Sequence, residues 1–274
     1  IVAAGDICNT SDTVHQKQKG KLHYHHFIEL TGFVPSLAGD RYAKGRLLLE
    51  QFLSVPGKAT LVPHAPYSVT PELFRMIAAD KNNQLISIHH QESADEEEFL
   101  LWGSGPMRSL YEHLQIDLSF FQPSGTPILP RTLSYFRPHH QVMLVHNLRL
   151  TAEEVIYIQG HQKALPELFF CLCPSANLYI GNGLPDMDLL MQSGFPIVLG
   201  TDSLASNTQL SILAEMKVLK DHFPHIPTIR LFEWATYQGA RALQLDAVFG
   251  SLEKGKSPGL VLCSEDLRRV ERIL

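Results

Sequence analysis

The chain has 274 residues, 45% of them hydrophobic, and a formal net charge of -5 from 23 basic and 28 acidic residues. This length suffices for one sizeable core and is usual for a single barrel domain. The charges are mixed along the chain without a basic stripe for a nucleic acid backbone, and no apolar run reaches the roughly 18 residues of a membrane helix. We therefore expect one domain that acts on a small molecule, with no nucleic acid or membrane partner.

Short apolar runs alternate with longer segments of helical period, which is the pattern of βα units around a parallel sheet. The runs expected to form strands lie at 1–7, 22–30, 59–63, 85–89, 142–146, 168–172 and 196–201. The tail, residues 251–274, predicts a turn and one last strand outside this pattern. The pattern predicts an α/β barrel.

Helix starts with recognisable chemistry stand between these runs. Thr70 precedes a proline and an apolar helical segment, and Thr151 with Glu154 forms a capping box. A further helix is expected near 229–245, and the Pro/Gly-rich residues 123–131 are expected to form an irregular loop. None of these segments is a flexible linker, which supports a single barrel unit.

The cysteines are Cys8, Cys171, Cys173 and Cys263, and they form neither a CxxC pair nor a secreted-type framework. They are typical of reduced, mostly buried thiols. We therefore expect a cytoplasmic protein.

Polar side chains stand where several of the expected strands end. His89 and His146 each close a strand, Asp202 follows another, and His64 follows the run at 59–63. In a parallel barrel the chemistry lies at the carboxyl ends of the strands, because the βα loops meet there. These residues are therefore the first candidates for a site.

The segment IHHQES places Glu92 three residues after His89. Imidazole is a good zinc ligand, and a carboxylate beside an activated water is a natural proton carrier. The same spacing is also frequent on solvated loops, and the acidic run 95–98 fits a solvated helix face. The pair is a candidate for a metal ligand and an acid.

His146 and Asp202 each have a structural alternative. His146 precedes a well-capped helix and could be a buried, satisfied core histidine. Asp202 follows Gly-Thr in a tight, backbone-rich turn that suits a carboxylate ligand. It could also cap the next helix, although Ser206, Asn207 and Thr208 lie nearer to that helix and could cap it instead.

The segment PHAPYS holds His64 between two prolines that stiffen the loop. We interpret His64 as a substrate contact, with a structural turn as the alternative. Ser175 and Asn177, in the loop CPSANLYIGNG, are candidate hydrogen-bonding residues for the substrate. The pair His23 and His25 has the HxH spacing of metal sites, but it begins its strand, so we expect it at the bottom of the barrel.

Taken together, PHAPYS, HHQES, LVHN, CPSANL with GNG, GTDSLASN and GSLEKGK resemble the amidohydrolase superfamily, in its branch of chlorohydrolases and nucleoside or guanine deaminases. The resemblance covers almost the whole chain. It implies a (βα)8 TIM-type barrel, a small β-sandwich built from both chain ends, and one divalent metal, zinc or iron, of which we expect zinc.

Carried over position by position, the resemblance makes His89 and Asp202 metal ligands. Glu92 becomes the proton shuttle, and Asp202 also accepts a proton from the attacking water. His146 polarises the attacked centre or holds the water. His64 matches the histidine that touches the purine in S-adenosylhomocysteine deaminase-like members.

One departure concerns the metal. The family's first strand ends in an HxH pair that supplies two more ligands, and no such strand precedes Ile1, since IVAAGDICN resembles the second strand. We therefore expect residues 1–250 to form a barrel lacking its first strand and helix, and 251–274 to be a remnant of the sandwich. Either the sequence is a fragment of a competent enzyme, which we favour, or the protein is a metal-poor, inactive barrel.

The predicted function is hydrolytic deamination of an adenosine-like or other aminated heterocycle, with release of ammonia. The PHAPYS and CPSANL segments favour a purine nucleoside, with aminodeoxyfutalosine as a candidate. The alternatives are a chlorohydrolase acting on a triazine-like ring and an inactive barrel used as a binding module. A homodimer is also compatible with the sequence.

Overall fold

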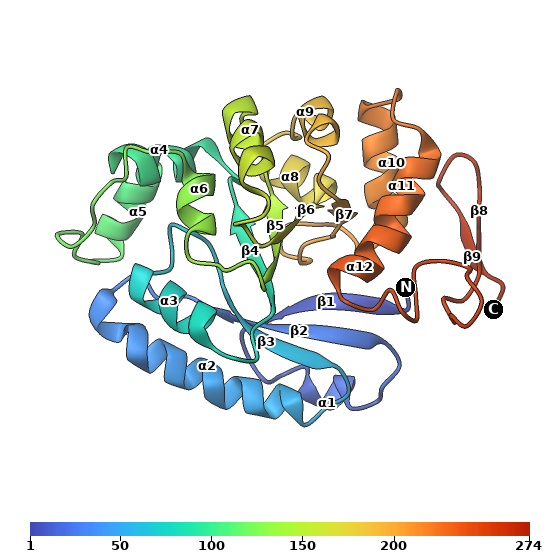
Figure 1. Ribbon diagram of the computed structural model, residues 1–274, viewed down its shortest axis with the longest axis horizontal. Helices are drawn as coiled ribbons and strands as arrows, with labels where there is room; N and C mark the ends of the chain where they lie inside the picture. The colour runs from blue at the N-terminus through green and yellow to red at the C-terminus, as the bar shows by residue number, and fades with distance from the viewer.

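The computed structural model describes residues 1–274 as an α/β fold in which helices cover parallel strands (Figure 1). One sheet has the order β1-β2-β3 and the other β4-β5-β6-β7, and every pairing within them is parallel. The strands are β1 (Ala3–Cys8), β2 (His23–Leu30), β3 (Lys58–Pro63), β4 (Leu85–His90), β5 (Gln141–His146), β6 (Glu167–Leu172) and β7 (Ile197–Leu199). All of them lie within two residues of the predicted bounds.

The helices follow the strands as expected for βα units. They are α1 (Val14–Lys17), η1 (Pro35–Leu37), α2 (Ala38–Leu53), α3 (Pro71–Ala79), α4 (Ala94–Trp102), α5 (Pro106–His113), α6 (Ile128–Leu133), α7 (Ala152–His161), α8 (Pro174–Ile180), α9 (Met187–Gln192), α10 (Ile212–His222), α11 (Thr228–Glu233), η2 (Trp234–Gln238) and α12 (Gly239–Ala242). The predicted helix starts are confirmed, since the Thr70 side chain accepts from Leu73 N and Thr151 forms a capping box with Glu154.

Two predictions about irregular segments were only partly right. The loop predicted at 123–131 ends early, because α6 begins at Ile128; Pro130 fits there, since the first helical turn needs no intrahelical N–H donor. The helix predicted near 229–245 is interrupted by the wider turn η2 between α11 and α12. A pattern of apolar residues does not reveal such a local change of pitch.

Both faces of the strands are buried, and they form two separate cores. The larger core lies between strands and helices, and Ile28, Leu61 and Phe170 belong to it. The smaller core contains residues of both sheets, namely Phe27, Val62, Leu85, Met143, Val145, Phe169, Cys171 and Val198. Because neighbouring strand residues point to opposite faces, burial on both sides gives the continuous apolar runs seen in the sequence.

The two sheets meet between β3 and β4 without a strand ladder. At this seam His89 N donates to His64 O over 2.9 Å, and Thr60 Oγ1 donates to Leu85 O over 2.9 Å. No ladder joins β7 to β1 either. The predicted α/β architecture with parallel strands is confirmed, whereas the strand ladders do not close into a ring.

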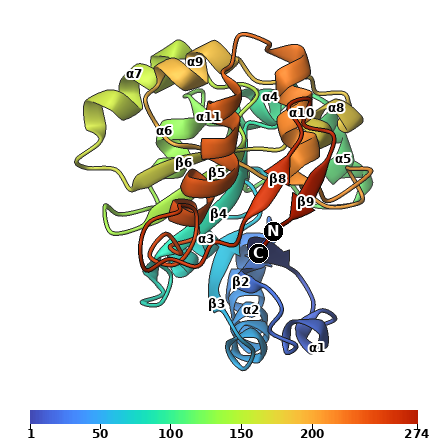
Figure 2. The same ribbon diagram turned by 90° about the vertical axis from the view of Figure 1, so that its right-hand side faces the viewer.

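The C-terminal tail forms a small hairpin instead of the single strand predicted for it. Strands β8 (Val261–Cys263) and β9 (Val270–Arg272) pair antiparallel. Figure 2 shows the two chain ends side by side near this hairpin, and Leu260 N donates to Leu274 O over 3.1 Å. The boundary between a barrel at 1–250 and a separate segment at 251–274 stays a prediction. No helix is both long and apolar enough to cross a membrane.

The contact between α2 and β2 gives a test of the fold. A methyl group at Gly45 would overlap the buried Leu30 side chain, whereas at Gly39, in the same helix, no atom lies within 4 Å of the added group. We expect Gly45→Ala to lower the free energy of unfolding by about 1–3 kcal/mol through overpacking. The control Gly39→Ala should raise it by up to about 1 kcal/mol. Urea unfolding of both variants checks this, and equal stabilisation by both would contradict the packing described.

Candidate active site

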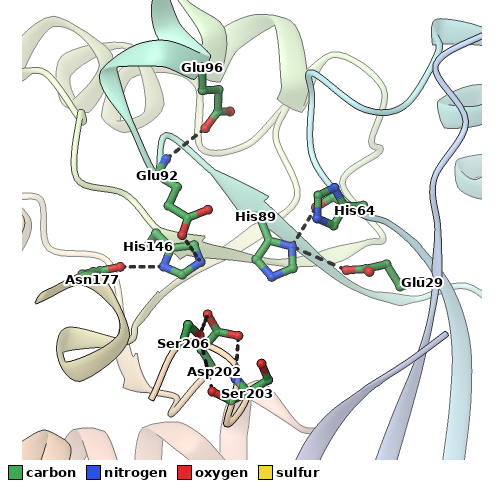
Figure 3. Close-up of polar contacts among 10 residues, drawn as sticks. All are labelled: Glu29, His64, His89, Glu92, Glu96, His146, Asn177, Asp202, Ser203 and Ser206. Carbon is green, nitrogen blue, oxygen red and sulfur yellow. Dashed lines mark hydrogen bonds and ion pairs between the residues drawn. The ribbon is translucent and has the colours of Figure 1, made fainter. Parts of the chain in front are cut away.

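Four polar side chains converge at the carboxyl ends of β4, β5 and β7 (Figure 3). His89 is the penultimate residue of β4 and His146 the last residue of β5, and their ring centroids lie 5.5 Å apart. Glu92 follows β4 and Asp202 follows β7. The predicted convergence of these four residues at the strand ends agrees with where the structure places them.

The backbone is strained where these strands end. Non-glycine residues with positive φ lie at the ends of β4 and β5, namely Gln91 (52°), His146 (79°) and Asn147 (59°), and a further one, Asp202 (56°), lies in the turn after β7. Each such conformation costs free energy, so the surrounding structure must hold it. Strained residues of this kind are frequent at functional sites.

His89 presents one ring nitrogen to acceptors. Its Nδ1 lies 3.0 Å from the backbone oxygen of His64 and 3.5 Å from Oε1 of Glu29 (Figure 3). The other nitrogen, Nε2, is left for a different partner. A metal-binding histidine commonly has this arrangement, with one nitrogen donating to a carbonyl or carboxylate.

His146 is fully buried between two polar residues, Asn177 and Glu92. Its Nδ1 lies 2.8 Å from Oδ1 of Asn177, and its Nε2 lies 3.6 Å from Oε1 of Glu92 without a hydrogen-bond partner. Burial lowers the pKa of His146, and the neighbouring Glu92 acts in the opposite direction. The imidazole therefore favours the neutral form, with Glu92 placed to exchange a proton nearby.

Glu92 is held through its backbone. Its N–H donates to Oε2 of Glu96 over 2.9 Å, and the Ser93 side chain caps α4. Glu96 is 1% exposed, and burial raises its pKa to about 8. Burial, together with Glu96 and Glu92, also raises the pKa of Tyr67. The Glu92 side chain thus projects from a turn that a second, buried carboxyl group fixes.

Asp202 is oriented by the turn that follows it. Its Oδ1 accepts from Ser203 N over 2.6 Å, and its Oδ2 accepts from Ser206 Oγ over 2.7 Å. Helix α10 is capped by Ser211, so neither Asp202 nor the residues at 206–208 caps it. The capping alternative for Asp202 is therefore ruled out.

The predicted substrate residues have different surroundings. His64 is partly buried, its Nδ1 lies 2.6 Å from Ser68 Oγ, and its ring centroid lies 5.0 Å from that of His89. Burial lowers the pKa of His64. The Ser175 backbone N–H donates to Glu215, and Asn177 is fully buried against His146. His64 thus contacts His89, and Asn177 contacts His146, both of which belong to the four converging residues.

Two further residues of this region were missed by the sequence reasoning. Glu29, the penultimate residue of β2, lies beside His89, and Asn9, directly after β1, donates to Glu29 Oε2 over 2.8 Å. The rule that selects polar residues at strand ends would have found both. The pattern hides both residues, because Glu29 stands between two apolar residues of its run and Asn9 lies just beyond the end of its run.

The histidines predicted to lie away from the chemistry do so. His25 is at the amino-terminal half of β2, where its Nε2 lies 3.0 Å from Thr60 Oγ1. Burial lowers its pKa to about 3. This buried, hydrogen-bonded histidine fits a structural role.

The donor set at the strand ends fits part of a divalent metal site. His89 has its Nε2 available and Asp202 supplies a carboxylate, and both are ordinary zinc ligands. A second group, Glu29, His64 and His89, has ligand atoms within 4.8 Å of one another. On the outer face of the first sheet, Asp6, Cys8 and His26 are equally close, but the Lys17 ammonium already contacts Asp6 and Cys8 there.

Comparison with known proteins identifies the family. Residues 54–272 match the model of the amidohydrolase family. The chain belongs to this family. Among its relatives, the 5-methylthioadenosine/S-adenosylhomocysteine deaminase of Thermococcus sibiricus is 27% identical over 250 residues, which are 87% of this chain and 49% of that protein. The chain thus spans about half the length of the curated relatives that it matches.

Solved amidohydrolase structures share the fold. Helicobacter pylori aminofutalosine deaminase in complex with methylthio-coformycin superposes with a TM-score of 0.81 at 24% identity, covering 94% of this chain and 63% of that one. An adenosine deaminase from Xanthomonas campestris with bound zinc gives 0.70 at 21% identity, covering 95% and 57%. The α/β fold of this chain therefore matches these barrel structures over most of its length.

The buried carboxyl group of Glu96 predicts a dependence of stability on pH. Its pKa is raised from 4.5 to about 8, so its stabilising protonated form is fully present below about pH 4.5 and is lost as the pH rises through about 8. Glu96→Gln keeps an acceptor for Glu92 N but cannot ionise. We expect the difference in melting temperature between this variant and the wild type to shift steadily in favour of the variant as the pH rises from 4.5 to about 8.

The exposed Glu98 in the same helix provides the matched control. Glu98→Gln should follow the wild type at every pH. Thermal unfolding between pH 4.5 and pH 9 decides the matter. A constant offset between Glu96→Gln and the wild type would show that the buried carboxyl group does not titrate in this range.

Proposed function

We propose that this amidohydrolase releases ammonia from an adenosine-like nucleoside by hydrolytic deamination. The observation that carries the proposal is the approach of Glu92 Oε1 to within 3.6 Å of His146 Nε2, beside His89 at the end of the neighbouring strand. A carboxyl group and a neutral imidazole at this distance can share the proton transfers that ring deamination requires. The deaminases among the relatives support the same reaction class.

His89 and Asp202 are proposed to hold one divalent ion, zinc or, as the alternative, iron. The bound zinc of the Xanthomonas campestris relative supports zinc. When bound, such an ion would supply Lewis-acid activation of the attacking water. His89 is oriented for this role through its Nδ1 contact, and Asp202 through the hydrogen bonds from Ser203 and Ser206.

The remaining steps belong to the chain's own side chains. Asp202 would accept the proton of the attacking water. Glu92, whose side chain is 21% exposed, would protonate the ring nitrogen. The proton held by Asp202 would then pass to the departing amine, and Glu92 would recover its proton from the new hydroxyl group as ammonia leaves. His146 would stabilise the tetrahedral centre through its unpartnered Nε2, which carries the lone pair when Nδ1–H donates to Asn177 Oδ1 and can accept a hydrogen bond from the new hydroxyl group. Asn177 would hold His146 in the required orientation.

His64 is proposed to contact the purine, since its ring lies against His89 at the mouth of the site. The methylthio-coformycin bound to the Helicobacter pylori relative supports a nucleoside ligand. Ser175 and Asn177 stay proposed substrate residues, although their hydrogen bonds to Glu215 and His146 favour a supporting role. Aminodeoxyfutalosine, adenosine and 5′-deoxyadenosine are the substrates to try first.

The assignment of Glu92 is tested by Glu92→Gln. Loss of the proton donor should reduce ammonia release by a factor of about 10² to 10⁴, while the melting temperature stays close to that of the wild type. Glu98→Gln, at an exposed position on α4, is the control and should keep full activity. Activity of Glu92→Gln near that of the wild type would refute the role.

The same measurement separates the alternatives. Ammonia from nucleosides supports the deaminase, whereas chloride from a chlorinated triazine, without ammonia, assigns the chlorohydrolase. Absence of both products, with the ligand still bound, assigns the binding module.

A second variant tests the substrate contact. His64→Ala should raise KM about fivefold and leave kcat within a few-fold, because a lost hydrogen bond to the substrate is worth about 1 kcal/mol. The exposed His139 is the control, and His139→Ala should change neither constant. A large loss in kcat with an unchanged KM would argue against a binding role for His64.

A further inference from the structure

Glu29 carries a largely buried carboxyl group that the proposed reaction leaves without a role. It stands one residue before the end of β2, and its side chain is 7% exposed. Its register partner on β3 is Val62, a member of the core that joins both sheets, so Glu29 faces the interior of the fold. A carboxyl group in such a position is costly unless nearby donors compensate it.

The two oxygens of Glu29 face different donors. Oε2 accepts from the Asn9 side chain over 2.8 Å, and Oε1 lies 3.5 Å from Nδ1 of His89. Asn9 thereby fixes which oxygen turns toward His89. These contacts connect Asn9, Glu29 and His89 at the ends of β1, β2 and β4 (Figure 3 shows the contact between Glu29 and His89).

The acceptors around His89 determine the position of its proton. Both neighbours of Nδ1, the His64 carbonyl at 3.0 Å and Glu29 Oε1 at 3.5 Å, can only accept. A lone pair on Nδ1 would face two oxygen atoms, which is repulsive. A hydrogen on Nδ1 is donated to the His64 carbonyl and faces Glu29 Oε1, and Nε2 of the neutral ring must then carry the lone pair.

We propose that Glu29 is a positioning residue that holds His89 as its Nδ1–H tautomer, and so directs the Nε2 lone pair into the site. The inference rests on the proposed function only for the use of that lone pair. The His64 carbonyl alone would hold the Nδ1–H tautomer less firmly, because it also accepts from the backbone N–H of His89 over 2.9 Å. The carboxyl group adds a second acceptor and a negative charge on the same side of the ring.

The test reads the tautomer directly. Long-range proton–nitrogen spectra of the ¹⁵N-labelled, metal-free protein should show His89 as a single Nδ1–H tautomer, with its signals assigned by their loss in His89→Gln. In Glu29→Gln the amide can donate to Nδ1, so the Nε2–H form should become populated. Glu29→Asp, which keeps the charge, should retain more of the Nδ1–H form.

Controls separate positioning from general damage. Glu50→Gln, at an exposed position of α2, should leave the His89 signals unchanged. Asn9→Ala, at an exposed position, frees Glu29 without removing it and should broaden or split the same signals. It provides the readout if Glu29→Gln does not fold. Unchanged His89 signals in the folded Glu29 and Asn9 variants would overturn the proposal.

Metal affinity gives a second readout besides activity. Loss of a carboxylate that supports a metal-binding histidine typically weakens binding about 10- to 100-fold. We expect this loss of Zn²⁺ affinity in Glu29→Gln, measured against a chelator. If the wild type deaminates no nucleoside but the tautomer still shifts in Glu29→Gln, the proposed function fails and the positioning role stands. If deamination occurs and the tautomer does not shift, only the positioning role fails.

Discussion

Burial of the parallel strands on both faces is the constraint on which the rest of this structure depends. One face packs against helices and the other forms the core shared by the two sheets, so neither leaves room for many polar side chains within a strand. Polar groups are displaced to the strand ends, where the chain turns and solvent or ligand can reach them. His89, His146 and Glu29 all lie at the last or penultimate position of their strands.

The electrostatics of the site follow from this crowding. Burial lowers the pKa of His64 and His146, so these imidazoles favour the neutral form and do not offset the neighbouring carboxyl groups. Glu29, Glu92 and Asp202 then bring three carboxyl groups into one small region. Such a region favours a bound cation and a substrate that gains positive charge during proton transfer. The acidic surroundings are therefore a property of the fold as much as of the reaction.

Sequence periodicity located every parallel strand, and the strand-end rule selected the four residues that converge in the structure, because both depend on local order and burial. It did not reveal which neighbour satisfies a given polar group. Asn177 was interpreted as a substrate contact, whereas its carbonyl lies against His146. Glu29 was overlooked within an apolar run, although its partners come from β1 and β4. Such pairings join residues distant in the chain, and no local pattern encodes them.

The division into two sheets was equally hidden from the sequence, because strand pairing depends on how whole strands are placed. The seam between β3 and β4 also links fold and chemistry. One atom, the backbone oxygen of His64, accepts from both the backbone and the ring of His89. A change in the relative placement of the sheets would therefore move the ring together with the strand. The geometry of His89 is set by the junction of the two sheets, and Glu29 secures it from the strand on the far side of β3.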